Sequence, residues 1–168
     1  VREGWLVPVG QRLEIIKDID YSTVKLDSEG EFNEDDLARV MREDKPLYAL
    51  ADAAIKYSNY NGGQRRTLVF AASREHAIDV ADILNEKHRR SGTTGRAAAI
   101  HYKLDKDRRS QLIAAYKRGE IRYLTNYGIL IEGFDSDETR VIVNGRPIHK
   151  NRALFAQMVG RATRPLFE

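Results

Sequence analysis

Apolar runs of strand length alternate with segments of helical periodicity over the second part of the chain. The run over 67–72 is continuous, which is typical of a strand buried on both faces of a parallel sheet. Four strands are predicted, over 67–72, 97–101, 121–124 and 140–143. Because helical segments alternate with these runs, the pattern indicates βαβ units and a parallel sheet flanked by helices.

Polar residues of the capping type mark the starts of the predicted helices. Three helices are expected, over 74–87, 106–118 and 152–162, with Ser73, Asp105 and Asn151 as their N-caps. Gly119 and Pro165 would end the second and third of these helices.

The first part of the chain is less regular. One or two short strands are expected before residue 31. Asn33, which three acidic residues follow, would cap a helix that extends to about residue 42, and Pro46 would open another over 47–57. We interpret 1–58 as a connector or appendage and 59–168 as an α/β domain.

Composition narrows the class of protein. The chain has 168 residues, 42% of them hydrophobic and 32% charged, as expected for one ordinary folded domain. No apolar run approaches the length of a membrane span, and no basic-then-apolar leader is present, so we expect an intracellular, cytoplasmic protein. The chain contains no cysteine, which excludes a disulfide scaffold and a Cys-ligated metal centre.

Charge is divided unevenly along the chain. Residues 1–58 contain 8 Lys and Arg against 13 Asp and Glu, whereas residues 59–168 contain 20 against 12. The second part therefore carries a net charge of +8 and the first part −5. This asymmetry favours a polyanionic partner for the second part, although a basic face can also be merely solvated.

Familiar catalytic motifs are missing. The sequence has neither a G-x-x-x-x-G-K-[S/T] phosphate loop nor a G-x-G-x-x-G dinucleotide motif. No metal site is predicted, and the histidines form no triad-like arrangement. His76 and His88 are expected on a helix surface. On its own, this chain is expected neither to bind nor to hydrolyse a nucleotide.

The last predicted helix carries the most specific pattern. At 100° per residue, Gln157, Arg161 and Arg164 fall within about 60° of one another. Apolar residues that would pack on the sheet occupy the other side, namely Leu154, Phe155, Met158, Val159 and Ala162. Gly160 lacks a side chain beside the polar stripe, so another surface can approach closely. The pattern suits a phosphate clamp, and a solvated arginine face is the alternative.

Several segments resemble helicase motifs. The stretch Gln157-Met-Val-Gly-Arg161-Ala-Thr-Arg164 resembles motif VI of superfamily 2 helicases. The stretches 126–135 and 67–77 resemble motifs V and IV, and residues 101–108 with Gly119 resemble the segment between them. The chain is therefore similar to the second RecA-like motor domain of a DEAD/DEAH-type helicase, in the branch of restriction and repair helicases.

The resemblance implies roles around a nucleotide. Arg161 and Arg164 would act as arginine fingers on the γ-phosphate of ATP, which a missing first domain would hold together with Mg²⁺. The other nucleotide-binding residues would be Gln157, Gly160, Gly133 and Asp135. Asp135 can alternatively cap a local turn.

The resemblance also implies contacts with a nucleic-acid backbone. The residues concerned are Ser73, Arg74, His101, Asn126, Tyr127, Gly128 and Glu132. Ser73 can also be a plain N-cap, and His101 can be structural.

Some positions depart from the family pattern. Tyr127 and Gly128 replace the Thr-Asp of DEAD-box proteins, and Glu132 replaces a threonine that would donate to a phosphate. Gln157 replaces the DEAD-box histidine, which favours the DNA-acting branch.

Two functions remain open at this stage. The first is one half of an ATP-driven DNA helicase or translocase that works with an N-terminal RecA-like domain. The second is a non-catalytic basic module that binds nucleic acid. In both cases we expect a monomer that binds single-stranded or duplex DNA, with RNA as the alternative, and that has no membrane partner.

Overall fold

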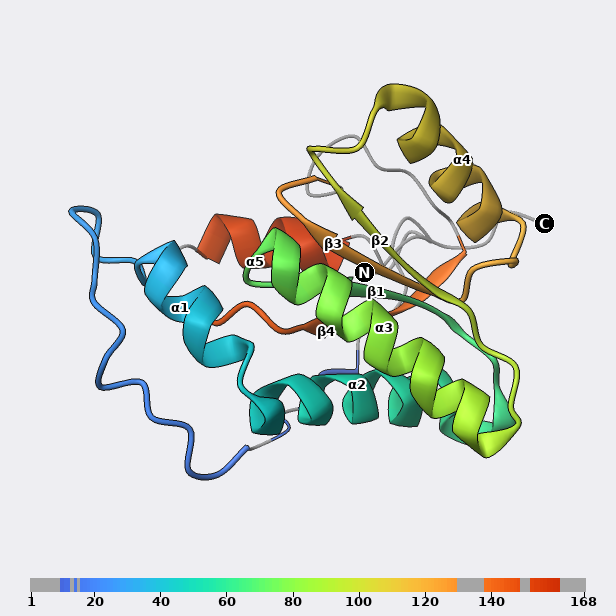
Figure 1. Cartoon of the computed structure of the whole chain (residues 1–168), viewed down its shortest axis with the longest axis horizontal. Coiled ribbons are helices and arrows are strands. Elements are labelled where there is room, and N and C mark those ends of the chain that lie inside the picture. Colours follow the sequence, from blue (N-terminus) through green and yellow to red (C-terminus); the bar gives the residue numbers. More distant parts are fainter. Residues whose placement is uncertain (1–9, 13, 15, 130–137, 149–151, 161–168) are drawn as a thin grey trace, which may run out of the picture.

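A computed structural model of the chain describes residues 10–12, 14, 16–129, 138–148 and 152–160. Its centre is a four-stranded parallel sheet with the strand order β2-β3-β1-β4. The strands are β1 (Arg66–Phe70), β2 (Ala97–His101), β3 (Tyr123–Tyr127) and β4 (Thr139–Asn144). Figure 1 shows the sheet between two groups of helices. The predicted RecA-like α/β class is confirmed.

Five α-helices and one short 3-10 helix are described. They are α1 (Glu34–Met41), α2 (Asp44–Ser58), η1 (Tyr60–Gly62), α3 (Arg74–Ser91), α4 (Lys106–Lys117) and α5 (Arg152–Val159). Three predicted N-caps are confirmed by hydrogen bonds, in which Asn33, Ser73 and Asp105 accept from backbone amides three residues further on. Asn151 lies outside the described residues.

Side chains point to alternate faces of the sheet along each strand, so each face has its own hydrophobic core. Val69 and Tyr123 face one side of the sheet, where they pack with residues of α2 and α3. Leu68 and Leu124 face the other side, where they pack with residues of α4 and with Met158 of α5. The fold therefore has three layers, as expected for parallel strands buried on both faces.

Helix α2 lies within the segment predicted as an appendage, yet it belongs to the core. Its residues Leu47, Leu50 and Ala51 are buried in the same cluster as Val69 and Tyr123. In the described part of residues 10–32, one antiparallel bridge joins Leu26 to Phe32. The proposed boundary near residue 58, and a link to another domain, remain predictions.

His76 and His88 correct the prediction that both lie on a helix surface, because both are buried. Helix α3 is covered by the sheet on one side and by α2 on another, so more than one stripe of it is hidden. His76 Nδ1 accepts a hydrogen bond from the Ala72 amide (3.0 Å). His88 Nδ1 lies 2.8 Å from Thr93 Oγ1, and His88 Nε2 lies 3.1 Å from the Tyr123 hydroxyl oxygen.

Strand β3 extends three residues beyond its predicted end. Thr125, Asn126 and Tyr127 continue the parallel pairing with β2, up to the pair of His101 with Tyr127. Asn126 and Tyr127 are thus strand residues rather than loop residues. None of the helices that the structure describes is long and apolar enough to cross a membrane.

Candidate functional site

The carboxyl ends of all four strands lie at one edge of the sheet, because the strands are parallel. Ligands of open α/β sheets bind beyond this edge. The edge gathers Ser73 and Arg74 after β1, His101 at the end of β2, and Tyr127 and Gly128 at the end of β3. We call this set the carboxyl edge. The structure therefore brings together most of the residues predicted to face nucleic acid.

Ser73 and Arg74 form the turn from β1 into α3. Ser73 Oγ accepts a hydrogen bond from the His76 amide (3.0 Å), so its role as an N-cap is confirmed. Arg74 Nε donates to Glu75 Oε1 (2.7 Å). The Arg74 guanidinium is one of the groups that hold the pKa of Glu75 below its usual range, after a backbone hydrogen bond of Glu75 itself. The Arg74 guanidinium is therefore paired with the Glu75 carboxylate beside the N-terminus of α3, where an anion would approach.

His101 does not present the exposed imidazole that the sequence suggested. Its side chain is buried, and Nδ1 has no hydrogen-bond partner among the described residues. Burial lowers the pKa of His101, and the positive charges of Arg74 and Lys103 lower it further. The ring is therefore neutral at pH 7 and adds no positive charge to the carboxyl edge.

Asn126 also differs from its predicted role. Its side chain is buried within the sheet, and Nδ2 donates to the Val69 carbonyl across the β1–β3 pair (3.0 Å). The amide therefore stabilises the sheet and does not face solvent in this structure.

Tyr127 and Gly128 lie at the accessible end of β3. The Tyr127 hydroxyl donates to Glu34 Oε2 of α1 (2.8 Å). Burial and this bond to Glu34 raise the pKa of Tyr127 to about 12, so the hydroxyl stays a donor. Gly128 adopts a φ of 70° beside the ring of Tyr102, which is 55% exposed.

Sequence reasoning missed two residues at this edge. Arg146 follows β4, and its Nη2 donates to Glu34 Oε1 (2.6 Å) while its guanidinium lies 6.0 Å from the centre of the Tyr127 ring. Arg146 could have been found from the sequence, because ligands bind beyond the carboxyl ends of parallel strands and Arg146 lies just beyond the end of β4. No local signal identifies Glu34, because its partners Tyr127 and Arg146 are distant from it in the sequence.

Helix α5 carries Gln157, one of the predicted nucleotide-binding residues, and Gly160 follows its last residue. Met158 is buried against the sheet, whereas Gln157 is exposed, as the predicted stripe requires. A Cβ added to Gly160 would come within 4 Å of no atom in the part of the chain that the structure describes. The remaining predicted site residues lie outside the described part of the chain, namely Arg161, Arg164, Gly133, Asp135 and Glu132.

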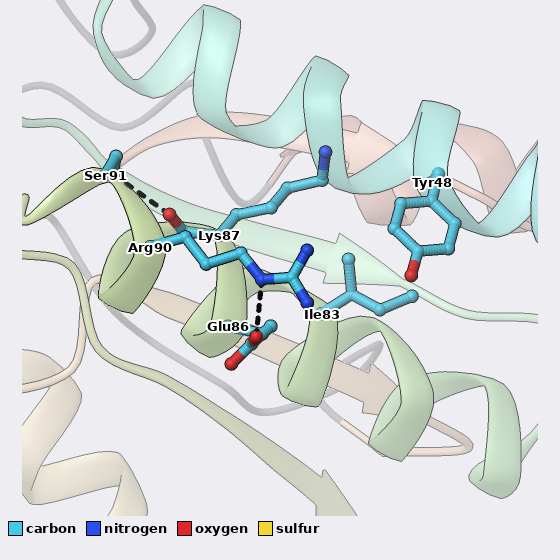
Figure 2. A pocket seen from close by; sticks show the side chains of 6 residues that line it. All are labelled: Tyr48, Ile83, Glu86, Lys87, Arg90 and Ser91. Carbon is cyan, nitrogen blue, oxygen red and sulfur yellow. Dashed lines mark hydrogen bonds and ion pairs between the residues drawn. The ribbon is translucent and has the colours of Figure 1, made fainter.

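A surface cavity of about 380 Å³ lies between α2 and α3, away from the carboxyl edge (Figure 2). Tyr48 and Ile83 contribute to its wall. Arg90 forms an ion pair with Glu86 one turn earlier in α3 (2.6 Å), and Lys87 forms one with Asp52 (2.8 Å). Its cations are thus paired within the chain. The described residues contain no cluster of His, Asp and Glu suited to a metal ion.

Comparison with known proteins identifies the family. Residues 49–165 match the family described as helicase conserved C-terminal domain. The ATP-dependent RNA helicase DBP3 of Lodderomyces elongisporus is 29% identical over 89 residues, which are 53% of this chain and 16% of DBP3.

Solved structures share the fold. The helicase Lhr of Mycobacterium smegmatis, bound to single-stranded DNA and AMP-PNP, has a TM-score of 0.60 at 24% identity. A DEAD box protein of Methanococcus jannaschii has a TM-score of 0.56 at 20% identity, and the Hef helicase domain of Pyrococcus furiosus one of 0.55 at 19%. These matches cover 72%, 70% and 72% of this chain, but only 16%, 30% and 24% of the three proteins. Because the family matches most of this chain, over residues 49–165, the chain belongs to the helicase conserved C-terminal domain family.

Proposed function

We propose that this chain is the second motor domain of an ATP-dependent nucleic-acid helicase or translocase. The carboxyl edge carries this proposal, because it places Ser73, Arg74, Tyr127 and Gly128 together on a sheet of the helicase C-terminal family. The sequence has no phosphate loop, so ATP and Mg²⁺ would be held mainly by a first motor domain. The domain would act in the cytoplasm as a monomer.

Helix α5 leads into the residues that would act on ATP. Gln157 is exposed and Met158 is buried, so the helix presents its polar side outward. In the sequence pattern Arg161 and Arg164 share a stripe with Gln157, and we propose that they would reach the γ-phosphate from across a domain interface. Charge stabilisation by such arginines contributes about 10³–10⁵-fold to the rate of phosphoryl transfer.

The carboxyl edge would hold the nucleic-acid backbone. Arg74 supplies charge at a helix N-terminus, and Tyr127 supplies a hydroxyl donor and an aromatic ring. We propose DNA as the substrate, because Gln157 replaces the histidine of DEAD-box RNA proteins. The relative DBP3 is named as an RNA helicase and Lhr was solved with single-stranded DNA, so RNA is the competing outcome.

The decisive experiment replaces Arg161 or Arg164 by alanine in the protein that joins this chain to a first motor domain. We expect nucleic-acid-stimulated ATP turnover to fall by about 10³-fold or more, because the fingers act on charge that develops in the transition state. The KM for ATP should change less than kcat. Lysine should restore little, because an ammonium group lacks the planar fork.

The matched control is Arg118→Ala, which removes an exposed arginine that is paired only with Glu120 in the described structure. That variant should keep wild-type turnover. The isolated 168-residue chain should hydrolyse no ATP. Wild-type turnover in both finger variants would instead support a non-catalytic nucleic-acid-binding module.

A further inference from the structure

Two donors, one at the end of β3 and one just after β4, converge on one carboxylate at the carboxyl edge. Tyr127 at the end of β3 donates to Glu34 Oε2 (2.8 Å), and Arg146 after β4 donates to Glu34 Oε1 (2.6 Å). The Arg146 guanidinium also lies against the Tyr127 ring, 6.0 Å from its centre. Both oxygens of Glu34 are thus held by groups at the strand ends, although Glu34 itself belongs to α1.

The same donors suit a phosphate group. Guanidinium and hydroxyl groups donate to phosphate oxygens as they donate to carboxylate oxygens, and the guanidinium fork is a preferred partner of both anions. Arg146 contacts no other carboxylate in the described structure within ion-pair distance. Without Glu34, this pair of donors would face solvent as an anion site.

The backbone that carries Arg146 is firmly placed. The Gly145 amide donates to the Phe70 carbonyl of β1 (2.8 Å), and the Arg146 amide donates to Asn144 Oδ1 (3.0 Å). Gly145 lies against Leu50 of α2 so closely that an added Cβ would be 2.3 Å from Leu50 Cδ2. The backbone position of Arg146 is therefore fixed by β1 and α2 and does not depend on Glu34, while the Tyr127 ring is a second contact of the guanidinium.

Of the three residues Glu34, Tyr127 and Arg146, Glu34 is the one that another anion can replace. Its side chain is 56% exposed, whereas that of Arg146 is 23% exposed. An exposed ion pair is weak and is screened by salt. Helix α1 is anchored separately, because Leu37 and Met41 pack against Ala72 in the segment between β1 and α3. Glu34 can therefore leave its partners without unfolding of α1.

We propose that Tyr127 and Arg146 bind a backbone phosphate of nucleic acid, and that Glu34 occupies this site until the phosphate displaces it. The identity of the ligand rests on the proposed function. The charge division along the chain supports the exchange, since Glu34 belongs to the acidic first part and its partners Tyr127 and Arg146 belong to the basic second part. Helix α1 would thereby lower the affinity of the domain for nucleic acid.

The test measures binding of a fluorescent single-stranded oligonucleotide to the 168-residue chain at about 50 mM and 200 mM salt. Glu34→Gln should raise the affinity about threefold to tenfold at the lower salt concentration, because it removes the competing charge. Asp35→Asn is the matched control, because it removes the same charge one residue away on the same helix. It should change the affinity less than twofold.

A double variant assigns the gain to Arg146. In the Glu34→Gln background, Arg146→Ala should abolish the gain and reduce the slope of log affinity against log salt by about 1. Thermal unfolding of each variant checks that the fold is kept. An equal response of Glu34→Gln and Asp35→Asn, with salt-dependent binding retained, overturns this inference alone. A complete absence of nucleic-acid binding in every variant overturns the proposed function as well.

Discussion

His76 is a buried base whose charge state the fold controls. Burial lowers its pKa from 6.5 to about 4, with Asp79 opposing and Arg42 reinforcing the shift. In the unfolded chain the ring gains its proton near pH 6.5, whereas in the folded chain it stays neutral until about pH 4. The free energy of unfolding should therefore fall as the pH decreases from 6.5 to 4, by about 3 kcal/mol from this residue.

Urea unfolding at pH 7, 5.5 and 4 measures this dependence. His76→Gln should flatten it, because a neutral amide replaces the ring and can still accept from the Ala72 amide. A smaller slope should persist, since burial also lowers the pKa values of His88 and His101. An undiminished slope in His76→Gln would assign the acid sensitivity to other groups.

Site residues were predictable from the sequence where a strand end decides their place. Ser73, Arg74, Tyr127 and Gly128 follow this rule and lie at the carboxyl edge. Asn126 and His101 do not face solvent, because β3 and β2 remain paired up to Tyr127 and His101. The length of a strand depends on its neighbours, which the local sequence does not contain.

At the scale of elements, Gly145 directly follows β4 and packs against Leu50 of α2. Gly145→Ala would place a Cβ 2.3 Å from Leu50 Cδ2 and 2.9 Å from Cδ1, in a buried region. We expect the variant to lose about 1–3 kcal/mol of unfolding free energy, because overpacking forces the core to shift. Chemical denaturation measures the loss.

Gly10→Ala is the matched control, since an added Cβ there would meet no atom of the described residues within 4 Å. It should change the stability by less than about 0.5 kcal/mol. Leu50→Val in the Gly145→Ala background should recover part of the loss, because it shortens the side chain that clashes. Equal stability of Gly145→Ala and wild type would contradict the close packing of α2 on this turn.

Local signals predicted the elements well and their arrangement less well. The apolar run near 67–72 and the caps Ser73 and Asp105 located β1, α3 and α4 within a few residues, because these signals act over short distances. Helix α2 was recognised as amphipathic, but its sequence does not say which surface it covers. The strand order is likewise set by pairing between distant segments.

At the scale of the whole molecule, the charge division predicts how the chain binds polyanions. Residues 59–168 carry a net charge of +8, and phosphate neutralisation releases counterions. Binding to nucleic acid should therefore be independent of sequence, with a Kd of about 10⁻⁴–10⁻⁶ M at physiological salt, and should weaken steeply between about 50 and 200 mM salt.

Titration with oligonucleotides of unrelated sequence at both salt concentrations tests this expectation. An oligonucleotide with an uncharged backbone serves as the control and should not bind. Tight binding that salt does not weaken would show that phosphate charge is not the main attraction.

The strand order has a consequence for how the chain acquires its fold. β1 is central, but it is synthesised first of the four strands, and it pairs Thr67 with Tyr123 on one side and with Val141 on the other. Both neighbours leave the ribosome much later, so the apolar faces of β1 stay uncovered during much of synthesis. Pairing between segments so distant makes folding slow and exposes the nascent chain to aggregation. Early protection of β1 by α2 and α3, which lie next to it in the sequence, would therefore govern the yield of folded protein.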